Sequence, residues 1–227
     1  MQRTIVVGDV HGCRDELEAL VKKCGFRPGE RLVLVGDLVA KGPDSPGVLA
    51  LARQWGAMAV LGNHDAHVLA IRNAESTGVP LENRGVKPEH RLVVDTLTAL
   101  DWLYLEALPL FLRLGPERDG DPDTVVLHAG AVPGRAIEEQ HREHLITMRS
   151  IRDDGEPTKK LKGRPWASLW TGPERIVFGH DAIRGLQEYP MATGLDTGCV
   201  YGGKLTALVL PERRMVSVDA QRAYVAL

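Results

Sequence analysis

Three short apolar runs, each ending at a glycine and followed by a polar motif and a helix-like segment, constrain this chain more than any other feature. The three units are residues 4–7 with 15–23, residues 32–35 with 46–54, and residues 58–61 with the helical stretch after Gly62. The runs are short and rich in β-branched residues, whereas the segments after them carry apolar residues at helical spacing. Strands that alternate with helices predict an α/β core with a largely parallel sheet.

The second half of the chain has a different pattern, because strand candidates follow one another with little helix between them. The candidates are residues 111–114, 124–127, 175–178, 204–210 and 215–218. We expect one clear helix here, at residues 137–146. Consecutive strands favour a sheet with antiparallel pairing, packed as the second layer of a sandwich.

Two segments interrupt this pattern. Residues 75–88 are rich in Gly, Pro, Asn and charge, and residues 89–108 are predicted to form one helix or a helical pair that ends at Pro109. We expect this region to be an inserted cap. Residues 153–164 are rich in charge, Gly and Pro and show no period, which predicts a mobile surface loop over the site.

A polar motif follows directly after each of the first three predicted strands. The motifs are Gly8-Asp9-Val10-His11-Gly12, Gly36-Asp37 and Gly62-Asn63-His64-Asp65. Ligands bind at the carboxyl ends of the strands in open α/β sheets, so we expect these side chains to converge. One such motif alone fits an ordinary turn, because Asp and Asn hydrogen-bond their own backbone. Three in succession favour a metal site.

Two histidines follow strand candidates in the second half of the chain. His128 comes directly after residues 125–127, and His180 follows residues 176–178 and one glycine. A lone histidine in such a place is usually a hydrogen-bonded structural residue, but beside the carboxylates of the first half this pair supplies the missing nitrogen ligands. The other histidines lack this setting and are interpreted as surface or helix residues: His67, His90, His141 and His144.

Composition limits the class of protein. The 227 residues suit one domain, and 44% hydrophobic with 26% charged residues is ordinary for a globular protein. A net charge of -2 builds in no general attraction to nucleic acid or membranes. The three cysteines include no CxxC pair, which disfavours a disulfide framework and favours a reducing, cytoplasmic location. We expect no targeting signal, and no apolar stretch approaches the roughly 20 residues that span a bilayer.

The motifs resemble those of the calcineurin-like metallophosphoesterases, whose blocks are GDxH, GDxx, GNH[DE], H and GH. The matching stretches are Gly8 to His11, Gly36-Asp37, Gly62 to Asp65, His128 and Gly179-His180, nearly end to end. The resemblance implies a β-sandwich of mixed sheets flanked by helices (α-β-β-α). It also implies a single domain over residues 1–227, in which about residues 76–110 form a small helical cap insertion.

Two divalent metal ions are implied by the same resemblance, with Mn2+ as the first choice and Co2+, Zn2+ or Fe as alternatives. One metal would take Asp9, His11 and Asp37, and the second would take Asp37, Asn63, His128 and His180. Two cations bridged in this way lower the pKa of a shared water and clamp the attacking and leaving oxygens. The implied reaction is therefore in-line attack of a metal-bridging hydroxide on phosphorus.

Two long stretches, residues 36–45 and 194–207, bring the resemblance closer to the ApaH-like phosphatases and the bis(5'-nucleosyl)-tetraphosphatases. The protein Ser/Thr phosphatases of the same superfamily carry GDxVDRG in the second block. Here Ala40 replaces the Asp and Lys41 replaces the Arg. These differences weaken the resemblance to protein phosphatases.

The histidine of the Gly-Asn-His block is the first choice for the general acid. A nucleotide or phosphate anion leaves readily, so protonation by His64 matters less than it would for an alcohol leaving group. In the protein phosphatases an Asp orients this histidine, and Ala40 removes it here. Asp65 and Asp181 both stay open as replacements.

Charge on the phosphate oxygens requires fixed cations. Lys41 is the first candidate, and Arg149 is the second, because a guanidinium matches phosphate geometry. A solvated helix end is the ordinary interpretation of Arg149, and Arg152 is the alternative cation. Backbone amides of the glycine-rich segment 196–203 are a further candidate, with a tight connection between strands as the equal alternative. The substrate contacts expected in this region are Tyr201 and Lys204.

These expectations favour a hydrolase of dinucleoside polyphosphates such as diadenosine tetraphosphate. The partner would be a small nucleotide or polyphosphate, with no membrane and no obligate protein partner. The alternatives are a Ser/Thr or Tyr phosphoprotein phosphatase, and an endopolyphosphatase or RNA 5'-cap hydrolase that acts on RNA 5' ends. A metal-binding scaffold without catalysis would lack ligands, and here all six ligand positions are filled.

Overall fold

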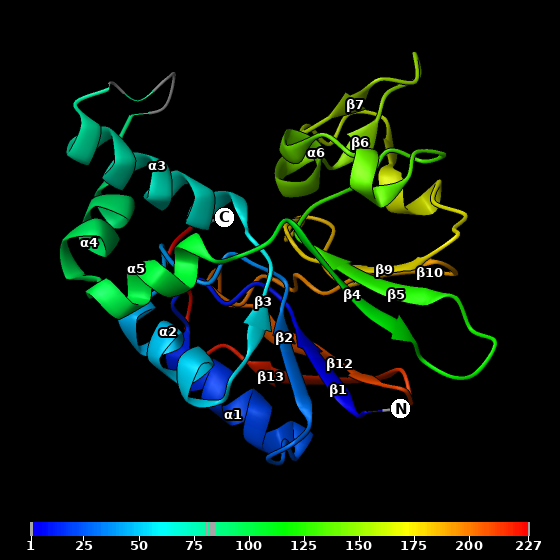
Figure 1. Cartoon of the computed structure of the whole chain (residues 1–227), viewed down its shortest axis with the longest axis horizontal. Helices are drawn as coiled ribbons and strands as arrows, with labels where there is room; N and C mark the ends of the chain where they lie inside the picture. The colour runs from blue at the N-terminus through cyan, green and yellow to red at the C-terminus, as the bar shows by residue number, and fades with distance from the viewer. Residues whose placement is uncertain (1, 80, 82–84, 227) are drawn as a thin grey trace.

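Two β-sheets packed face to face form the centre of the molecule, and helices lie on the outer sides of the pair (Figure 1). The computed structural model describes residues 2–79, 81 and 85–226. The arrangement confirms the predicted fold class, a sandwich of mixed sheets flanked by helices.

The first sheet has five strands in the order β13-β12-β1-β2-β3. They are β1 (Thr4–Val7), β2 (Arg31–Leu34), β3 (Met58–Ala59), β12 (Lys204–Leu210) and β13 (Arg214–Asp219). Strands β1, β2 and β3 are parallel, as the alternation of strands and helices predicts. Strands β12 and β13 were expected in the second layer, but they join this sheet with antiparallel pairing. The carboxyl ends of three parallel strands therefore meet at one edge of this sheet.

The second sheet also has five strands, in the order β10-β11-β9-β5-β4. They are β4 (Phe111–Pro116), β5 (Asp123–Leu127), β9 (Arg175–Phe178), β10 (Gln187–Tyr189) and β11 (Ala192–Gly194). The expected antiparallel pairing occurs at both edges, but β5, β9 and β11 are parallel. The reason is that the long crossover between β5 and β9 lets the chain re-enter the sheet in the same direction.

The two faces of β1 contribute to different parts of the core. Val6 packs between the sheets with Val126 and Val177, whereas Ile5 and Val7 belong to the apolar cluster beneath the helices. All three β1 side chains are fully buried. Burial on both faces explains why the strand is continuously apolar rather than alternating.

Local sequence signals set the ends of the helices on the first sheet. These helices are α1 (Arg14–Cys24), α2 (Ser45–Gln54), α3 (Asn63–Thr77), α4 (Pro88–Thr96) and α5 (Ala99–Glu106). The Asp44 side chain caps α2 by accepting a hydrogen bond from the Gly47 amide at 2.8 Å, and Pro46 lies in the first turn. Helix α1 ends at Gly25, whose left-handed backbone closes it.

Helices α4 and α5 form the predicted helical pair in the later part of the segment expected to form the cap. Residues 80 and 82–84 of that segment lie outside the described residues. Helix α4 packs against α2 and α3, and α5 packs against the same two helices. The buried side chains of Val93, Trp102 and Leu105 join the apolar cluster beneath α1 and α2. These two helices are therefore anchored in the main core.

The segment between β5 and β9 corrects two expectations. The helix expected at residues 137–146 is split into a 3-10 turn (Ile137–Glu139) and α6 (Arg142–Thr147), because Gln140 between them is extended and bonds the backbone of Val132. The segment 153–164, expected to be irregular, contributes to a small sheet. That sheet consists of β6 (Ser150–Ile151), β7 (Pro157–Thr158) and β8 (Arg164–Pro165). Strands of two residues are too short to show the alternation of apolar and polar residues by which a strand is predicted.

Among the described residues, no helix is both long enough and apolar enough to span a membrane.

Candidate metal centre

The polar motifs of both halves of the chain meet at the carboxyl ends of the parallel strands. Asp9 and His11 follow β1, Asp37 follows β2, His128 follows β5 and His180 follows β9. The backbone is left-handed at His11, Asp37 and His180, with φ of 47°, 49° and 68°. Residues with a side chain rarely adopt this conformation, so the chain is bent sharply at these points to aim the side chains.

One cavity of about 220 Å³ brings most of the predicted site residues together. Its lining includes Asp9, His11, Asp37, Lys41, Asn63, His64, Arg149, His180 and Tyr201. His128 lies fully buried beside it, with Nε2 3.1 Å from Oδ1 of Asn63. The convergence expected from the sequence is therefore present, while the role of each residue as a ligand stays a prediction.

Asp37 lies at the centre of the cluster. Its Oδ2 is 3.4 Å from His11 Nε2, and its Oδ1 is 3.5 Å from His128 Nε2. Among the described residues, Asp37 belongs to both groups in which nitrogen and oxygen donors lie within 4.8 Å of one another, one with His11 and His64 and the other with His128 and His180. A carboxylate in this position can serve two ions at once. Asp9 is not in either group, and its carboxylate accepts the His180 amide at 3.0 Å.

Three of the histidines have one ring nitrogen fixed by a backbone carbonyl. The pairs are His11 Nδ1 with Val39 (3.3 Å), His128 Nδ1 with Val35 (2.9 Å) and His180 Nε2 with Thr147 (3.0 Å). A carbonyl only accepts, so each of these nitrogens carries its hydrogen and the other nitrogen keeps a lone pair. Burial lowers the pKa of His11 to about 3 and also lowers the pKa values of His128 and His180. The three rings are therefore neutral at pH 7, as metal ligands must be.

Three carboxylates share the cavity. Burial, together with the charges of Asp196 and Asp37, raises the pKa of Asp9, and burial raises the pKa of Asp196 to about 6. Burial would also raise the pKa of Asp37, but His128, His64 and His11 lower it below its usual range. A divalent cation relieves such crowding of negative charge. The mixed oxygen and nitrogen donors suit Mn2+, Fe or Zn2+, so the residues fit the metals that the sequence predicts.

The glycines of the motifs allow the site segments to approach without side chains between them. A Cβ on Gly62 would lie 2.1 Å from the Asp37 amide nitrogen, and a Cβ on Gly179 would lie 1.9 Å from Asp9 Oδ1. A Cβ on Gly8 would lie 2.4 Å from the carbonyl oxygen of Leu195. These separations are far below van der Waals contact, so only glycine fits.

Lys41 reaches into the cavity from the loop after Asp37. Its Nζ lies 3.1 Å from His11 Nε2 and donates a hydrogen bond to the Tyr201 hydroxyl at 2.9 Å. The backbone of Lys41 is left-handed, with φ of 68°. Both side chains expected to contact substrate here, Lys41 and Tyr201, therefore lie at the cavity.

The other expected cations differ in position. Arg149 lines the cavity, and its guanidinium donates to the carbonyl oxygen of His180 at 3.0 Å. Lys204 does not line it, because its half-exposed side chain pairs with Asp219 at 3.1 Å, so the expected substrate contact of Lys204 is not supported. Arg152 also does not line the cavity.

His64 has a partner that the sequence did not suggest. Its backbone amide donates to Asp37 Oδ1 at 2.8 Å, and its ring Nδ1 lies 2.9 Å from Nε2 of His90. Burial lowers the pKa of His64 to about 2. His90, expected to be an ordinary surface or helix residue, lies on α4 with only 3% of its surface exposed.

Asp65 and Asp181 were the two acids considered for orienting His64, and neither contacts its ring. Asp65 accepts hydrogen bonds from the amides of Gly62 and Leu38, both at 3.0 Å, so it holds the two motif loops together. Burial raises the pKa of Asp65 to about 7. Asp181 pairs with Arg184 at 2.5 Å.

Asp196 is a site residue that sequence reasoning missed. Its carboxylate lines the cavity and accepts the Gly198 amide at 3.1 Å. Asp196 comes shortly after the end of β11, just as Asp37 comes shortly after the end of β2. The signal that indicated Asp37, a polar residue after a strand, was therefore also present for Asp196. Strand β11 has only three residues and was not predicted, which hid that signal.

A family model provides the deciding comparison, because the model described as calcineurin-like phosphoesterase matches residues 2–207. The chain belongs to the calcineurin-like phosphoesterase family. A metal-dependent hydrolase is thus confirmed, and the two clusters of nitrogen and oxygen donors agree with divalent metal ions as cofactors.

Relatives with this phosphoesterase fold extend over nearly the whole chain. A bis(5'-nucleosyl)-tetraphosphatase PrpE, asymmetrical, from Anoxybacillus flavithermus is 31% identical over 97% of this chain and 96% of its own length. A symmetrical bis(5'-nucleosyl)-tetraphosphatase from Aromatoleum aromaticum is 31% identical over 94% of this chain and 96% of its own. A crystal structure of a candidate diadenosine tetraphosphatase is 40% identical, with a TM-score of 0.83, and covers 96% of this chain and 94% of its own.

Proposed function

We propose that this phosphoesterase hydrolyses dinucleoside polyphosphates such as diadenosine tetraphosphate, using two divalent metal ions, with Mn2+ as the first choice. The observation that carries the proposal is the single cavity in which carboxylate and imidazole donors face a lysine and an arginine. Relatives named as tetraphosphatases over nearly the full chain support the substrate class. We further propose that residues 1–227 act as one unit, with α4 and α5 as the cap.

Asp37 lies in both proposed ligand sets, and His11, His128 and His180 are the further ligands that also belong to the two donor groups around it. Asp9, His11 and Asp37 would hold one ion, and Asp37, Asn63, His128 and His180 would hold the other. When bound, such a pair of ions activates water and neutralises charge at phosphorus. The chain's own contribution is to keep the three imidazoles neutral and turned by their carbonyl partners, so that no rearrangement is needed before binding.

Lys41, Tyr201 and Arg149 would bind the polyphosphate. The hydrogen bond from Lys41 to Tyr201 holds the ammonium group at the cavity, where it can meet the nonbridging oxygens. His64 would donate a proton from Nε2, since its Nδ1 faces His90. A phosphate or nucleotide leaves readily, so this proton matters less for an anhydride than for an alkyl ester.

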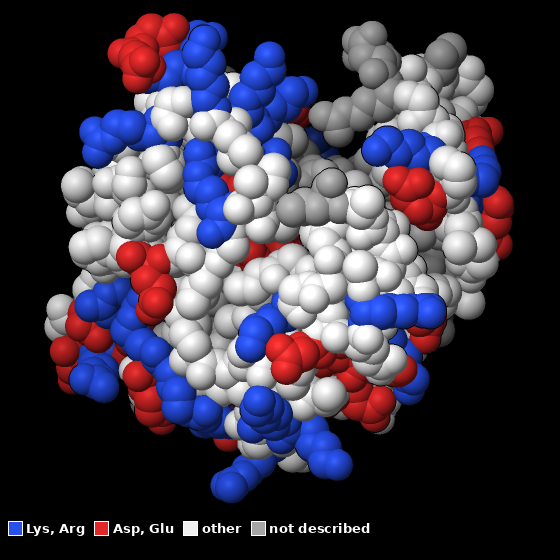
Figure 2. Space-filling view, turned by 180° about the vertical axis from the view of Figure 1, so that it is seen from behind, with Lys and Arg blue, Asp and Glu red and all other residues white. Residues whose placement is uncertain are grey.

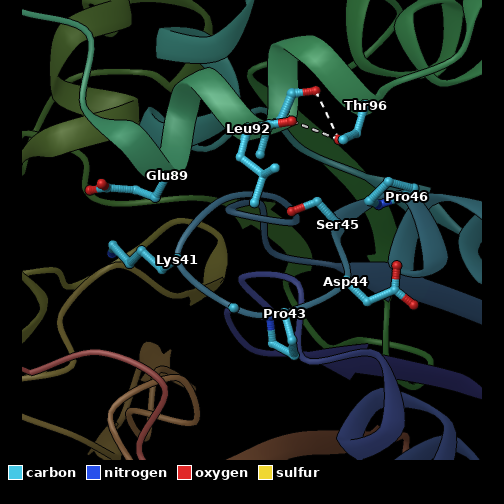
Figure 3. Close-up of a pocket in the computed structure, with 10 residues that line it drawn as sticks. Lys41, Pro43, Asp44, Ser45, Pro46, Glu89, Leu92 and Thr96 are labelled. Atoms are coloured by element: carbon cyan, nitrogen blue, oxygen red, sulfur yellow. Dashed lines mark hydrogen bonds between the residues drawn. The ribbon is translucent and has the colours of Figure 1, made fainter.

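A second cavity of about 240 Å³ adjoins the first and offers a place for a nucleoside. Lys41 lines both cavities. In Figure 3, Leu92 points from α4 into the second cavity above the loop that runs from Lys41 to Pro46, and Glu89 approaches from the same helix. Apolar walls beside the carboxylates of Asp44 and Glu89 suit a nucleobase, which has an apolar face and polar edges. Phosphates held at Lys41 would direct a nucleoside here.

The charge on the surface also favours a small substrate. On the face shown in Figure 2, Lys and Arg side chains are interspersed with Asp and Glu. Extended RNA binding depends on a continuous basic surface. The three cysteines are free and buried, which supports the proposed reducing cytoplasm.

The test is an assay of the Mn2+-loaded protein against diadenosine tetraphosphate, inorganic polyphosphate, capped RNA and a phosphopeptide. We expect the dinucleotide to be hydrolysed most efficiently. ADP as the sole product would mean symmetrical cleavage, and ATP with AMP would mean asymmetrical cleavage. Turnover of the phosphopeptide alone would overturn the proposal.

Substitution of the phosphate-binding lysine tests the site directly. Lys41→Ala should lower kcat/KM for diadenosine tetraphosphate about 100-fold, because the negative charge of the transition state loses a fixed cation. Lys22→Ala, which removes an exposed lysine on α1, is the matched control and should retain wild-type activity. Equal activity of the two variants would remove Lys41 from the site.

A further inference from the structure

The two rings of the His64 and His90 pair are joined end to end. Their facing nitrogens are 2.9 Å apart, the ring planes differ by 15°, and the centroids are 5.1 Å apart. The centroid separation exceeds the nitrogen separation by roughly two ring radii, so the nitrogens point at each other and the rings do not lie face to face. One ring donates and the other accepts, which fixes the plane and direction of the His64 ring.

His90 is itself held firmly by two helices. Its ring lies against that of His67 on α3, with centroids 4.6 Å apart and planes at 86°. Its neighbour Arg91 bonds Glu75 of α3, with Nη2 3.2 Å from Oε2, and Val93, one turn further along α4, is buried in the core. Helix α4 therefore presents His90 from a rigid support.

Packing alone does not explain a histidine at this position. His90 is 3% exposed, and its Nδ1 has no hydrogen-bond partner among the described residues. A buried polar atom without a partner costs stability that an apolar side chain of similar size would not. A leucine could also pack against the His67 ring, but only a histidine can form the hydrogen bond to His64.

We propose that His90 is the positioning residue for His64, the task left open by Ala40. Ala40 has only a buried methyl group, and Asp65 and Asp181 are engaged elsewhere. The inference rests on the proposed function in one respect, namely that His64 protonates the leaving oxygen. The group that orients His64 is then the imidazole of His90 on α4, in place of a carboxylate at position 40 in the loop after β2.

The main test compares two substitutions of the orienting residue in the Mn2+-loaded full chain. His90→Leu keeps the packing and removes the bond, and His90→Gln keeps a hydrogen-bonding group near the position of Nε2. Phenyl phosphate and p-nitrophenyl phosphate are the substrates, because the first has the poorer leaving group and depends more on protonation. Neither is a dinucleotide, so the result does not depend on the proposed substrate.

We expect His90→Leu to lower kcat for phenyl phosphate about 100-fold with little change in KM, since the proton donor is misdirected while binding is intact. The loss with p-nitrophenyl phosphate should be smaller, and His90→Gln should recover most of the activity. His141→Gln, at an exposed histidine, is the matched control. Equal losses on both substrates, or no recovery by glutamine, would overturn the proposal.

Two further measurements separate positioning from a general structural role. In a His64→Ala background, His90→Leu should cause no further loss, because a residue that acts only through His64 has nothing left to position. In the metal-free protein, the ring nitrogens of His64 should show one tautomer by 15N NMR and a mixture in His90→Leu. Additive losses, or an unchanged tautomer, would contradict the inference. Inactivity of the wild type on diadenosine tetraphosphate as well as on both esters would instead refute the proposed function.

Discussion

At the scale of single residues, the site depends on glycines that leave room as much as on side chains that bind. Gly62 lets the start of α3 approach the backbone of Asp37, and Gly179 lets the loop after β9 approach the Asp9 carboxylate. Both contacts join segments that are distant in sequence. The donor positions around Asp37 therefore depend on the absence of a methyl group at two places.

Gly62→Ala tests this dependence. The new Cβ would overlap the Asp37 amide, a backbone atom that cannot move aside by a rotamer change. We expect Mn2+ affinity, measured by calorimetry, to fall about 10- to 100-fold as Asp37 is displaced. Gly85→Ala is the control, because its Cβ would meet open space, and it should leave affinity unchanged. Equal affinities in the two variants would contradict this account.

The set of side chains at the site could be predicted where each one follows a recognisable strand. Asp37 and His180 were found in this way because a glycine-bounded motif follows an apolar run. Asp196 and His90 were missed for different reasons. The strand before Asp196 is too short to show a pattern, and His90 reaches the site only through the packing of α4 on α3, which no local pattern records.

At the scale of elements, the start of α5 is fixed by a reciprocal cap. The Thr98 hydroxyl accepts the Asp101 amide, and Asp101 accepts the Thr98 amide at 2.8 Å. Asp101 also forms an ion pair with Arg53 of α2, and its side chain is only 2% exposed. Because Asp101 meets a backbone amide and a guanidinium together, it joins α5 to the helix that covers the first sheet.

Asp101→Asn should therefore destabilise the protein by about 1–3 kcal/mol at pH 7, as measured by urea unfolding. Burial would raise the pKa of Asp101, but hydrogen bonds from Thr98 and the charge of Arg53 lower it overall. A lowered pKa means that the stabilisation is present above the unfolded value, about 4, and is lost as pH falls through the folded value. The difference from wild type should shrink below pH 4. Asp119→Asn, at an exposed loop, should show neither effect.

The sequence predicted the helices and the strands of four or more residues, whereas β3 was the one shorter strand that it predicted among the described residues. The run at β1 was found at its observed bounds, and the helical pair of the cap was found with small shifts. The short strands β6, β7 and β8 were absent from the prediction, because two residues held by pairing with distant segments leave no periodic trace. The parallel direction of β9 was also missed, since strand direction depends on the crossover.

At the scale of the whole molecule, the metal centre joins the two layers. Asp9 and Asp37 extend from the first sheet, and His128 and His180 extend from the second. Ions bound between them would cross-link the sandwich at one edge. Such ligands converge only in the folded chain, so metal binding and stability are linked.

Removing metal with EDTA should lower the melting temperature by about 5–10 °C, and adding Mn2+ should restore it, because saturating ligand adds roughly 3 kcal/mol to a domain of this size. Asp37→Asn should abolish this metal-dependent shift, since the proposed bridge between the two ions is lost. Differential scanning calorimetry provides the measurement. A shift in Asp37→Asn as large as in the wild type would argue against the proposed bridge.

The left-handed backbone at His11, Asp37 and His180 lowers the stability of the fold at residues that the proposed activity needs. Each such residue costs about 1–3 kcal/mol relative to a relaxed conformation, and glycine or asparagine would relieve part of that cost. Glycine would delete the donor, and asparagine would replace a carboxylate or an imidazole with a neutral amide. An effort to make this enzyme more heat-resistant has to leave these three sites alone and seek its gains on the outer helices.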